Sequence, residues 1–385
     1  MVPRLLTVAV LVAGCAAVGL AQQGIPPLNH AKLEKLAEPW PDADALRARR
    51  IDAEQRRLFG GTDPFPFTLQ ADFKTIGKDR NPESKNDYPG LLTVDGPAGP
   101  TVLHVQLRPR GHFRRRATMC SFVPVRVEFD KAEAKGTIFD GQKSLKLVVH
   151  CNNEDDYEQY ILREYAVYRV MNLLTPMSFR ARLARVSYVQ SKPGDAVHAA
   201  GSVKPFTTRF GMFIEDQDDV ARRAEARVME IPRITFKELE PDPLSLVMVF
   251  EYMISNTDFS IYALHNVKLL RTQDRKIFVV PYDFDLSGLV HTSYAVATSG
   301  IGQLTVRDRV YRGPCRPEAE IQPVLDRFRE HKDDVLAVYD SLHELDSAYR
   351  GEAKQYLQEF FSTIAKENSV RKTFVSGQCS TKPLM

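Results

Sequence analysis

The sequence is poor in residues that build metal–thiolate centres and in segments that cross membranes. It holds five cysteines among 385 residues and a single tryptophan, Trp40, to which we assign no function. No C-x-x-C pair is present, which argues against a zinc site. No segment beyond the N-terminus is apolar enough to span a bilayer. The chain also lacks internal repeats.

The chain has no large excess of charge of either sign. It carries 52 Lys and Arg against 49 Asp and Glu, a net charge of +3, which argues neither for nor against nucleic acid. We expect no nucleic-acid partner. With 43% hydrophobic and 26% charged residues, the composition is that of a globular protein and far from a disordered one. The length suffices for one large domain or two lobes.

The N-terminus is typical of an export signal. Arg4 precedes an apolar stretch from Leu5 to Leu20, and cleavage after Ala21 gives a signal peptide of residues 1–21. The alternative is a lipoprotein signal that ends at Cys15, in which case the protein is held on a membrane. Either way we expect an exported protein, periplasmic, extracellular or lipid-anchored at the cell envelope.

Export changes what the cysteines indicate. Apart from Cys15, four cysteines remain, and an even number in an oxidising compartment suggests two disulfides. The pairs Cys120–Cys151 and Cys315–Cys379 would each stay within one half of the chain. The sequence allows three connectivities.

Strand signals dominate the first half and helix signals the second. Residues 22–65 have helical spacing and indicate a helical arm or tether. Residues 66–215 contain alternating and β-branched runs such as "TVLHVQLR", with one helix after Cys151. Residues 216–385 are mainly helical. This order predicts an α+β protein of two lobes with a cleft between them.

Two carboxylates follow an apolar run in "KIFVVPYDFDLSGLV", residues 276–290. In an extended chain Asp283 and Asp285 point to the same face, as a site for a hard cation requires. The alternative is a strand that runs out into a polar turn. A buried carboxylate is costly unless it is paired or bound to a cation.

A second group of polar residues lies upstream in "ISNTDFSIYALHNVKLL". Asp258 can accept a proton from a hydroxyl, and Asn266 offers an amide oxygen to a metal that Asp283 also binds. Magnesium held by a few protein oxygens together with phosphate is usual in phosphoryl-transfer sites. The alternative is that Asp258 and Asn266 end a helix and start a hairpin. We expect His265 to orient the loop.

These segments resemble the CotH-type kinases, atypical protein kinases first met in spore coats. "NTDFSIYALHN" and "VVPYDFDLSG" look like the family's N-x-D…N and P-x-D-x-D segments. "LRPRGHFRRR" resembles its Arg-Gly loop, with His112 and Phe113 in place of the usual Asn and Ser. "KSLKLVVHCNNEDDYEQYILREYAVYRV" is similar to its Lys-bearing strand and the following helix. "FGMFIEDQDD" resembles the strand that leads into the hinge between the lobes.

The resemblance implies a bilobal protein-kinase-like fold, with a β-rich N-lobe (66–215), a helical C-lobe (216–385) and an ATP/metal cleft between them. Asp258 would be the catalytic aspartate. The implied metal ligands for Mg²⁺ or Mn²⁺ are Asn266, Asp283 and Asp285, with Asp285 either a second acidic ligand or a structural acid. The implied ATP-binding residues are Arg110, Gly111, Lys146 and Glu164, with Glu158 as the alternative partner of Lys146.

The basic loop "RPRGHFRRR" fits a phosphate site. Arg110 beside Gly111 lets a guanidinium and the backbone approach phosphate oxygens together. The alternatives are a solvated basic strand edge or a patch that faces anionic lipid.

Three function classes compete. The first is an exported CotH-like kinase that transfers phosphate from ATP to Ser or Thr of a protein substrate. The second is a catalytically inactive, pseudokinase-like binding or structural module of the cell envelope. The third, a metal-dependent phosphohydrolase using Asp258, Asp283 and Asp285, ranks last because no His-rich cluster supports it. The only membrane contact expected is through a lipidated Cys15.

Overall fold

The structure is a computed structural model that describes residues 24–96, 99–192 and 204–380. The predicted signal of residues 1–21 and its Cys15 lie outside the described residues. In the described part of the chain, no helix combines the length and the apolar character needed to cross a membrane.

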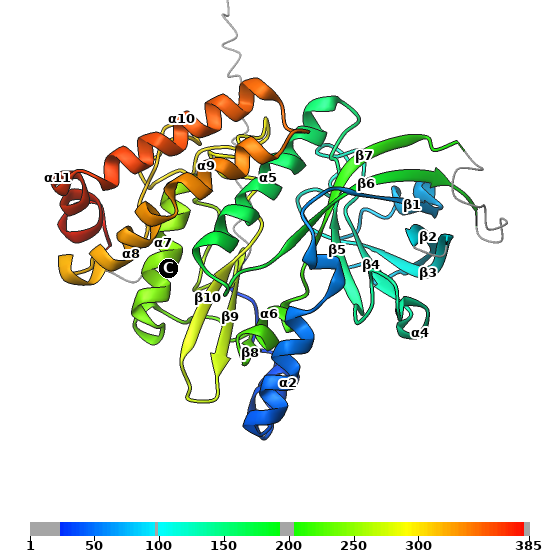
Figure 1. The fold of residues 1–385 in the computed structure, drawn as a ribbon, viewed down its shortest axis with the longest axis horizontal. Helices are drawn as coiled ribbons and strands as arrows, with labels where there is room; N and C mark the ends of the chain where they lie inside the picture. The colour runs from blue at the N-terminus through cyan, green and yellow to red at the C-terminus, as the bar shows by residue number, and fades with distance from the viewer. Residues whose placement is uncertain (1–23, 97–98, 193–203, 381–385) are drawn as a thin grey trace, which may run out of the picture.

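Seven strands close into a barrel in the order β1-β2-β3-β4-β5-β7-β6 (Figure 1). The closing pair, β1 with β6, is parallel, whereas the other neighbouring strands are antiparallel. The strands are β1 (Phe65–Ala71), β2 (Tyr88–Gly96), β3 (Gly99–Pro109), β4 (Val125–Phe129), β5 (Ser144–Val148), β6 (Ala181–Gln190) and β7 (Thr207–Ile214).

Alternating side chains fill the barrel. In β3, Leu103, Val105 and Leu107 are buried, and the residues between them are exposed or half-buried. Aromatic rings occupy the middle, where Phe67 and Phe213 stack with ring centroids 5.5 Å apart. This interior forms its own hydrophobic cluster, separate from the one among the helices.

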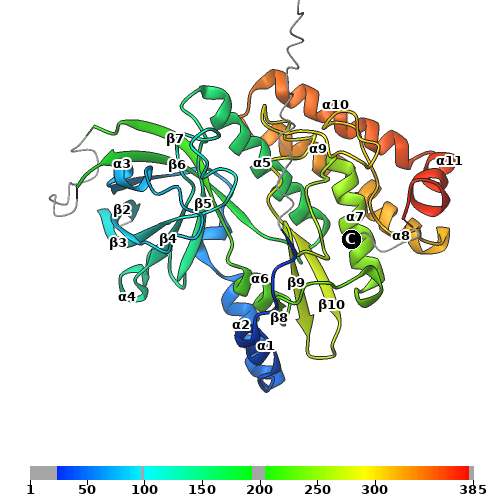
Figure 2. The same ribbon diagram turned by 180° about the vertical axis from the view of Figure 1, so that it is seen from behind.

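The rest of the chain combines a small antiparallel sheet with helices (Figure 2). The sheet has the order β10-β9-β8, from β8 (Ala226–Met229), β9 (Val267–Thr272) and β10 (Ile277–Pro281). The helices are α1 (His30–Ala37), α2 (Ala43–Glu54), α3 (Phe73–Ile76), α4 (Lys131–Ala134), α5 (Asp155–Leu174), α6 (Gln217–Arg223), α7 (Pro241–Ile254), α8 (Glu318–Glu330), α9 (Lys332–Ser341), α10 (Ser347–Ile364) and α11 (Glu367–Val370).

Helix α5 lies between the barrel and the C-terminal helices in both views (Figures 1 and 2). It packs against β6 and β7 on one side and α9 on another. Its first turn carries Asp155, Asp156 and Glu158, which suit the positive end of the helix dipole. Because α5 packs against other elements on more than one side, the polar side chains on those sides can reach the loops beside it.

The predicted bilobal protein-kinase-like fold, with an ATP/metal cleft between a β-rich N-lobe and a helical C-lobe, is wrong. The strands instead close into a seven-stranded mixed barrel, accompanied by a separate three-stranded sheet and helices. Alternation in the sequence shows which residues form strands, but it does not show which strands pair. The closure depends on contacts such as Phe67 with Val186, which are far apart in sequence.

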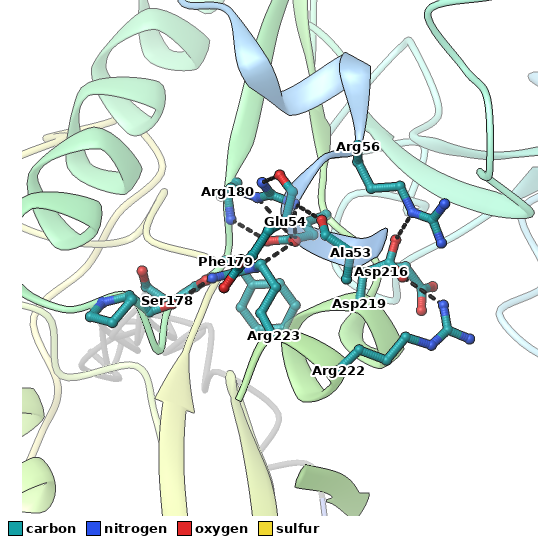
Figure 3. A network of polar contacts seen from close by, with 12 residues as sticks. Ala53, Glu54, Arg56, Ser178, Phe179, Arg180, Asp216, Asp219, Arg222 and Arg223 are labelled. Atoms are coloured by element: carbon teal, nitrogen blue, oxygen red, sulfur yellow. Dashed lines mark hydrogen bonds and ion pairs between the residues drawn. The ribbon is translucent and has the colours of Figure 1, made fainter. Parts of the chain in front are cut away.

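The described part of the predicted N-terminal arm is held against the start of β6 and α6. Arg180 donates to the carbonyls of Ala53 and Glu54 at the end of α2, at 2.7 and 3.1 Å (Figure 3). These carbonyls have no partner within the helix, so the guanidinium caps it. Arg56 adds an ion pair with the buried Asp219 at 3.2 Å.

The carboxylate of Glu215 is the centre of this network. Its side chain is fully buried and pairs with Arg180 at 2.7 Å and Arg223 at 2.8 Å. Arg223 also donates to the carbonyls of Pro176 and Ser178, both at 2.6 Å (Figure 3). The arm, the segment before β6 and helix α6 are therefore joined by one buried set of charges.

Two disulfides are present, Cys120–Cys151 and Cys315–Cys379. This is the connectivity in which each bond stays within one half of the chain. Both bonds are compatible with an exported protein.

Candidate functional site

Asp258 lies in a loop fixed by contacts on both sides. Helix α7 ends at Ile254, and the left-handed backbone of its C-cap residue Ser255 (φ 52°) turns the chain towards Asp258. Arg312 donates to the carbonyls of Thr257 and Phe259, at 2.6 and 2.9 Å. The backbone on either side of Asp258 is therefore held by one guanidinium.

The carboxylate of Asp258 is oriented by two neighbours. Nε2 of His265 lies 3.1 Å from Asp258 Oδ1, and Nδ2 of Asn266 donates to Asp258 Oδ2 at 2.9 Å. Burial alone would lower the pKa of His265, but the hydrogen bond and the charge of Asp258 outweigh it and raise that pKa. The structure thus brings Asp258, His265 and Asn266 together, and His265 contacts the carboxylate of Asp258.

The amide nitrogen and the amide oxygen of Asn266 have different roles. Both amide protons are used on Asp258, whose backbone carbonyl accepts the second bond at 2.7 Å. The amide oxygen of Asn266 is left to accept from, or bind, another group. Its backbone is left-handed (φ 51°), a conformation that asparagine tolerates better than most residues.

The two aspartates after β10 lie beside α5. The backbone N–H of Asp283 donates to the hydroxyl of Tyr168 at 2.9 Å, and that of Phe284 to Oε1 of Glu164 at 3.3 Å. Asp285 accepts from the hydroxyl of Tyr294 at 3.1 Å. Two side chains of one helix therefore position the backbone of this segment.

A glycine allows the chain to pass close to α7 just beyond this segment. A Cβ at Gly288 would lie 2.4 Å from the carbonyl oxygen of Val306 and 2.9 Å from the Cβ of Ser255. The N–H of Gly288 donates to the carbonyl of Ser255 at 3.0 Å. The glycine of "DFDLSG" is thus required by the close approach of three backbone segments.

Glu164, Asp283 and Asp285 form an acidic cluster. Burial, then the charges of Asp285 and Asp283, raise the pKa of Glu164 well above its usual value. Burial and the charge of Asp283 likewise raise the pKa of Asp285 to about 7. Carboxylates behave in this way when they are placed together in a poorly solvated site.

Arg114, which the sequence alone does not mark as a site residue, lies at this cluster. It lines a small cavity of about 10 Å³ together with Glu164, Asp285 and Tyr294. Its charge lowers the pKa values of both Glu164 and Asp285, but burial and repulsion are stronger. Arg114 is part of the basic loop "RPRGHFRRR", but nothing in the sequence distinguishes it from the neighbouring arginines.

Lys146 lies in a buried environment with other cations. Burial, then the charges of Arg110 and Lys268, lower the pKa of Lys146 to about 7, and the charge of Asp283 opposes this. The ammonium of Lys146 lies over the ring of Tyr282, 4.3 Å from its centroid. The cations near Lys146 thus repel one another much as the carboxylates do.

Most arginines of the basic loop are engaged within the protein. Arg108 pairs with Asp87 at 2.6 Å, and the buried Arg115 pairs with Asp79 at 2.8 Å. Arg114 donates to the carbonyl of Val149 at 2.6 Å. Among the described residues, the guanidinium of Arg110 has no hydrogen bond or ion pair, which leaves it available to a ligand beside Lys146.

Gly111 follows Arg110 with a φ of +85°, which side-chain-bearing residues rarely adopt. A Cβ at this position would meet no atom within 4 Å. The glycine is therefore required by the turn of the loop and not by a close approach.

Glu164 does not form an ion pair with Lys146 within the described structure, and it contacts the 283–285 segment instead. The alternative partner, Glu158, accepts from Arg185 at 3.1 Å and from the backbone of Phe210 at 2.7 Å. Glu158 thus belongs to the contact between α5 and the barrel.

No group of three or more His, Cys, Asp or Glu side chains arranged to hold a metal is found in the described ranges. The predicted ligand set contains two carboxylates and one amide, so it calls for further oxygens from a ligand. The donor types suit Mg²⁺ or Mn²⁺, which bind few protein oxygens and complete their shell with water or phosphate. A bound cation would favour the ionised form of these carboxyl groups.

Comparison with models of known protein families found no match, and comparison with curated proteins found none either. The resemblance to the CotH-type kinases therefore stays a prediction.

Proposed function

We propose that this protein is an exported phosphotransferase that transfers the terminal phosphoryl group of ATP to a Ser or Thr hydroxyl of a protein, with Mg²⁺ or Mn²⁺. The observation that carries the proposal is that the loop of Asp258 and Asn266 meets the segment of Asp283: the N–H of Tyr282 donates to the carbonyl of Asn266 at 3.0 Å. Burial and neighbouring carboxylates raise the pKa values of Glu164 and Asp285, and burial and neighbouring cations lower that of Lys146. A divalent cation with a polyphosphate would relieve the repulsion within both groups of charges.

Each predicted site residue has a role in this proposal. Arg110 and Lys146 would contact phosphate oxygens, with Gly111 shaping the loop. The amide oxygen of Asn266 and the carboxylates of Asp283 and Asp285 would hold the metal. Bound there, the metal would neutralise phosphate charge. Glu164 would keep the 283–285 segment in place.

Asp258 would act on the acceptor. Its carboxylate accepts the hydroxyl proton as the acceptor oxygen bonds to the terminal phosphorus, while the bond from that phosphorus to ADP breaks. His265 and Asn266 hold the carboxylate in a single orientation for this step. The positions of Arg312 and Ser255 support the same loop.

A non-catalytic binding module is the second candidate. His112 and Phe113 depart from the usual Arg-Gly loop, and they follow the glycine directly. Such a module would bind its ligand with the same cations but transfer no phosphate. The expected location is the same in both cases, at the cell envelope or outside the cell.

The test is a thermal-shift titration with ATP, in Mg²⁺, in Mn²⁺ and in EDTA. A ligand that binds only the folded state, at about 100 times its Kd, adds roughly 2.7 kcal/mol to the free energy of unfolding. A phosphotransferase requires nucleotide and metal together. A phosphohydrolase would show a shift with metal alone. A binding module would show no shift that depends on nucleotide or on metal.

The variant Asp283→Asn should lose the metal-dependent part of this shift, because it removes a carboxylate that the proposal assigns to the metal. Asp274→Asn, an aspartate in the exposed turn between β9 and β10, is the matched control and should bind as the wild type does. An Asp283→Asn protein with an unchanged shift would remove Asp283 from the site.

A further inference from the structure

The disulfide Cys120–Cys151 lies at the edge of the acidic cluster. Cys151 lines the same small cavity as Arg114, Glu164 and Asp285. The bond joins the end of the basic loop to the segment that follows β5, and β5 carries Lys146. One covalent link thus lies between the loop that bears Arg110 and the strand that bears Lys146.

Non-covalent contacts between the two segments cluster around this bond. The N–H of Phe122 donates to the carbonyl of Cys151 at 3.0 Å, and that of Ser121 to Oδ1 of Asn152 at 2.9 Å. Arg114 donates to the carbonyl of Val149. All of these contacts require the loop to stay beside the end of β5.

A third segment, which contains Asp79 and Arg80, also fixes the loop. Arg80 donates to the carbonyl of Cys120 at 2.8 Å and to that of Ser121 at 3.0 Å. Arg115 is buried and bound to Asp79. Arg110 is therefore presented by a loop whose position is set by its neighbours, with the disulfide as the covalent part.

We propose that the Cys120–Cys151 disulfide is a positioning element of the phosphate site, so that the protein binds a metal–polyphosphate ligand well only after these two thiols are oxidised. The proposal rests on the proposed function. Cys315–Cys379 closes a longer loop, with a sequence separation of 64 against 31, and joins segments beside α8 and α11. We assign the Cys315–Cys379 bond no role in positioning the phosphate site.

The oxidation is a thiol–disulfide exchange with a small disulfide such as oxidised glutathione. The thiolate of one cysteine attacks the glutathione disulfide and releases one glutathione thiol. The second cysteine then displaces the other, which forms the S–S bond of the protein and leaves two reduced glutathione molecules. Both cysteines are buried in the folded protein, so the exchange belongs to folding.

The test compares two double variants, Cys120→Ser/Cys151→Ser and Cys315→Ser/Cys379→Ser. ATP with Mg²⁺ is titrated into each, and limited trypsin digestion measures the rate of cleavage after Arg114 and Arg115. Loss of either bond should lower the melting temperature, and the bond that closes the longer loop should matter at least as much.

The first variant should bind Mg–ATP about tenfold or more weakly, since binding must now order the loop and its arginines. Its loop should also be cleaved faster than that of the wild type. The second variant should match the wild type in both measurements. Equal affinity in the first variant and the wild type would overturn the inference, whereas no metal-dependent shift in the wild type would overturn the proposed function and this inference with it.

If the Cys120→Ser/Cys151→Ser variant does not melt cooperatively, the test uses the variant Arg80→Gln instead, which keeps both disulfides. This change releases the carbonyls of Cys120 and Ser121 without touching a residue of the proposed site. Weaker Mg–ATP binding with faster cleavage of the loop would support positioning by the loop. Unchanged binding despite faster cleavage would overturn it.

Discussion

Asp258 accepts hydrogen bonds from two neighbours through different oxygens, which fixes the plane of its carboxylate. Asn266 uses its amide protons for this purpose and keeps its oxygen for a ligand. Asn266 thus links the proposed base, Asp258, to the proposed metal ligands. Removing the charge of Asp258 should affect proton transfer more than ligand binding.

We expect Asp258→Asn to lower the rate of phosphoryl transfer by about 100-fold or more, because the amide cannot accept the hydroxyl proton. The affinity for Mg–ATP should stay close to that of the wild type. Transfer is measured as labelled phosphate incorporated into exported acceptor proteins, and affinity by the thermal shift. An Asp258→Asn protein that still transfers phosphate at the wild-type rate would exclude Asp258 as the base.

Glu251 is a second buried acid near this loop, and burial raises its pKa to about 8 against the opposing effects of Asn256 and Arg312. Because the pKa is raised in the folded state, the folded state binds this proton more tightly than the unfolded state. The stability that Glu251 contributes is therefore complete below its unfolded pKa and is lost as the pH rises towards 8.

The variant Glu251→Gln should remove this contribution. Between pH 5 and pH 7, the free energy of unfolding of the wild type should fall relative to the variant by about 1.4 kcal/mol for each pH unit. Urea unfolding at several pH values measures the difference, and Glu330→Gln, on the exposed end of α8, is the control. Parallel pH profiles for wild type and Glu251→Gln would show that this carboxyl is ionised in the folded protein.

At the scale of elements, helix α6 and the arm are connected through a set of buried charges. Glu215 forms ion pairs with both Arg180 and Arg223. Arg180 in turn caps α2 (Figure 3). Such a buried set is strongly destabilised when one member is removed, since the remaining charges stay buried and unpaired.

Glu215→Gln should therefore cost about 3 kcal/mol or more of the free energy of unfolding. Asp218→Asn is the matched control, since Asp218 pairs with Lys35 on the surface at 3.6 Å, and it should cost less than about 1 kcal/mol. Both are measured by urea denaturation. A Glu215→Gln protein as stable as the control would mean that the arm is held mainly by other contacts.

At the scale of the whole molecule, the barrel has its own core, in which Phe213 meets the rings of Phe65, Phe67 and Phe139. Its side chain is fully buried. Residues in such a position contribute through both transfer from water and close packing.

We expect Phe213→Ala to lower the free energy of unfolding by about 3–5 kcal/mol, because it leaves a cavity among three rings. Phe213→Leu should cost less, since it retains much of the volume. The midpoint of urea unfolding gives both values. Equal effects of the two changes would contradict a cost that depends on the cavity.

The strands and helices could be predicted from local patterns to a large extent. "TVLHVQLR" alternates and falls within β3, and the expected helix after Cys151 is α5. The pairing of β1 with β6 could not be predicted, because it joins residues on either side of α5. That pairing decides between an open sheet and a closed barrel.

The candidate site also combines contacts that could be predicted from the sequence with contacts that could not. Asp258, His265 and Asn266 are close in sequence, and their mutual hydrogen bonds follow from a single loop. Arg114 and Tyr294 reach the acidic cluster from distant segments. A spacing pattern carries no signal for such contacts, since they depend on how the basic loop is fixed to the end of β5.

The closure of the barrel also sets an order in time. One edge of β1 can be paired as soon as β2 exists, but its other edge waits for β6, after α5 has been made. Pairing between strands so distant in sequence is slow to form, and an exposed strand edge can pair with other chains in the meantime. The interval between the arrival of β1 and that of β6 is therefore the period in which a newly emerging chain is most exposed to aggregation.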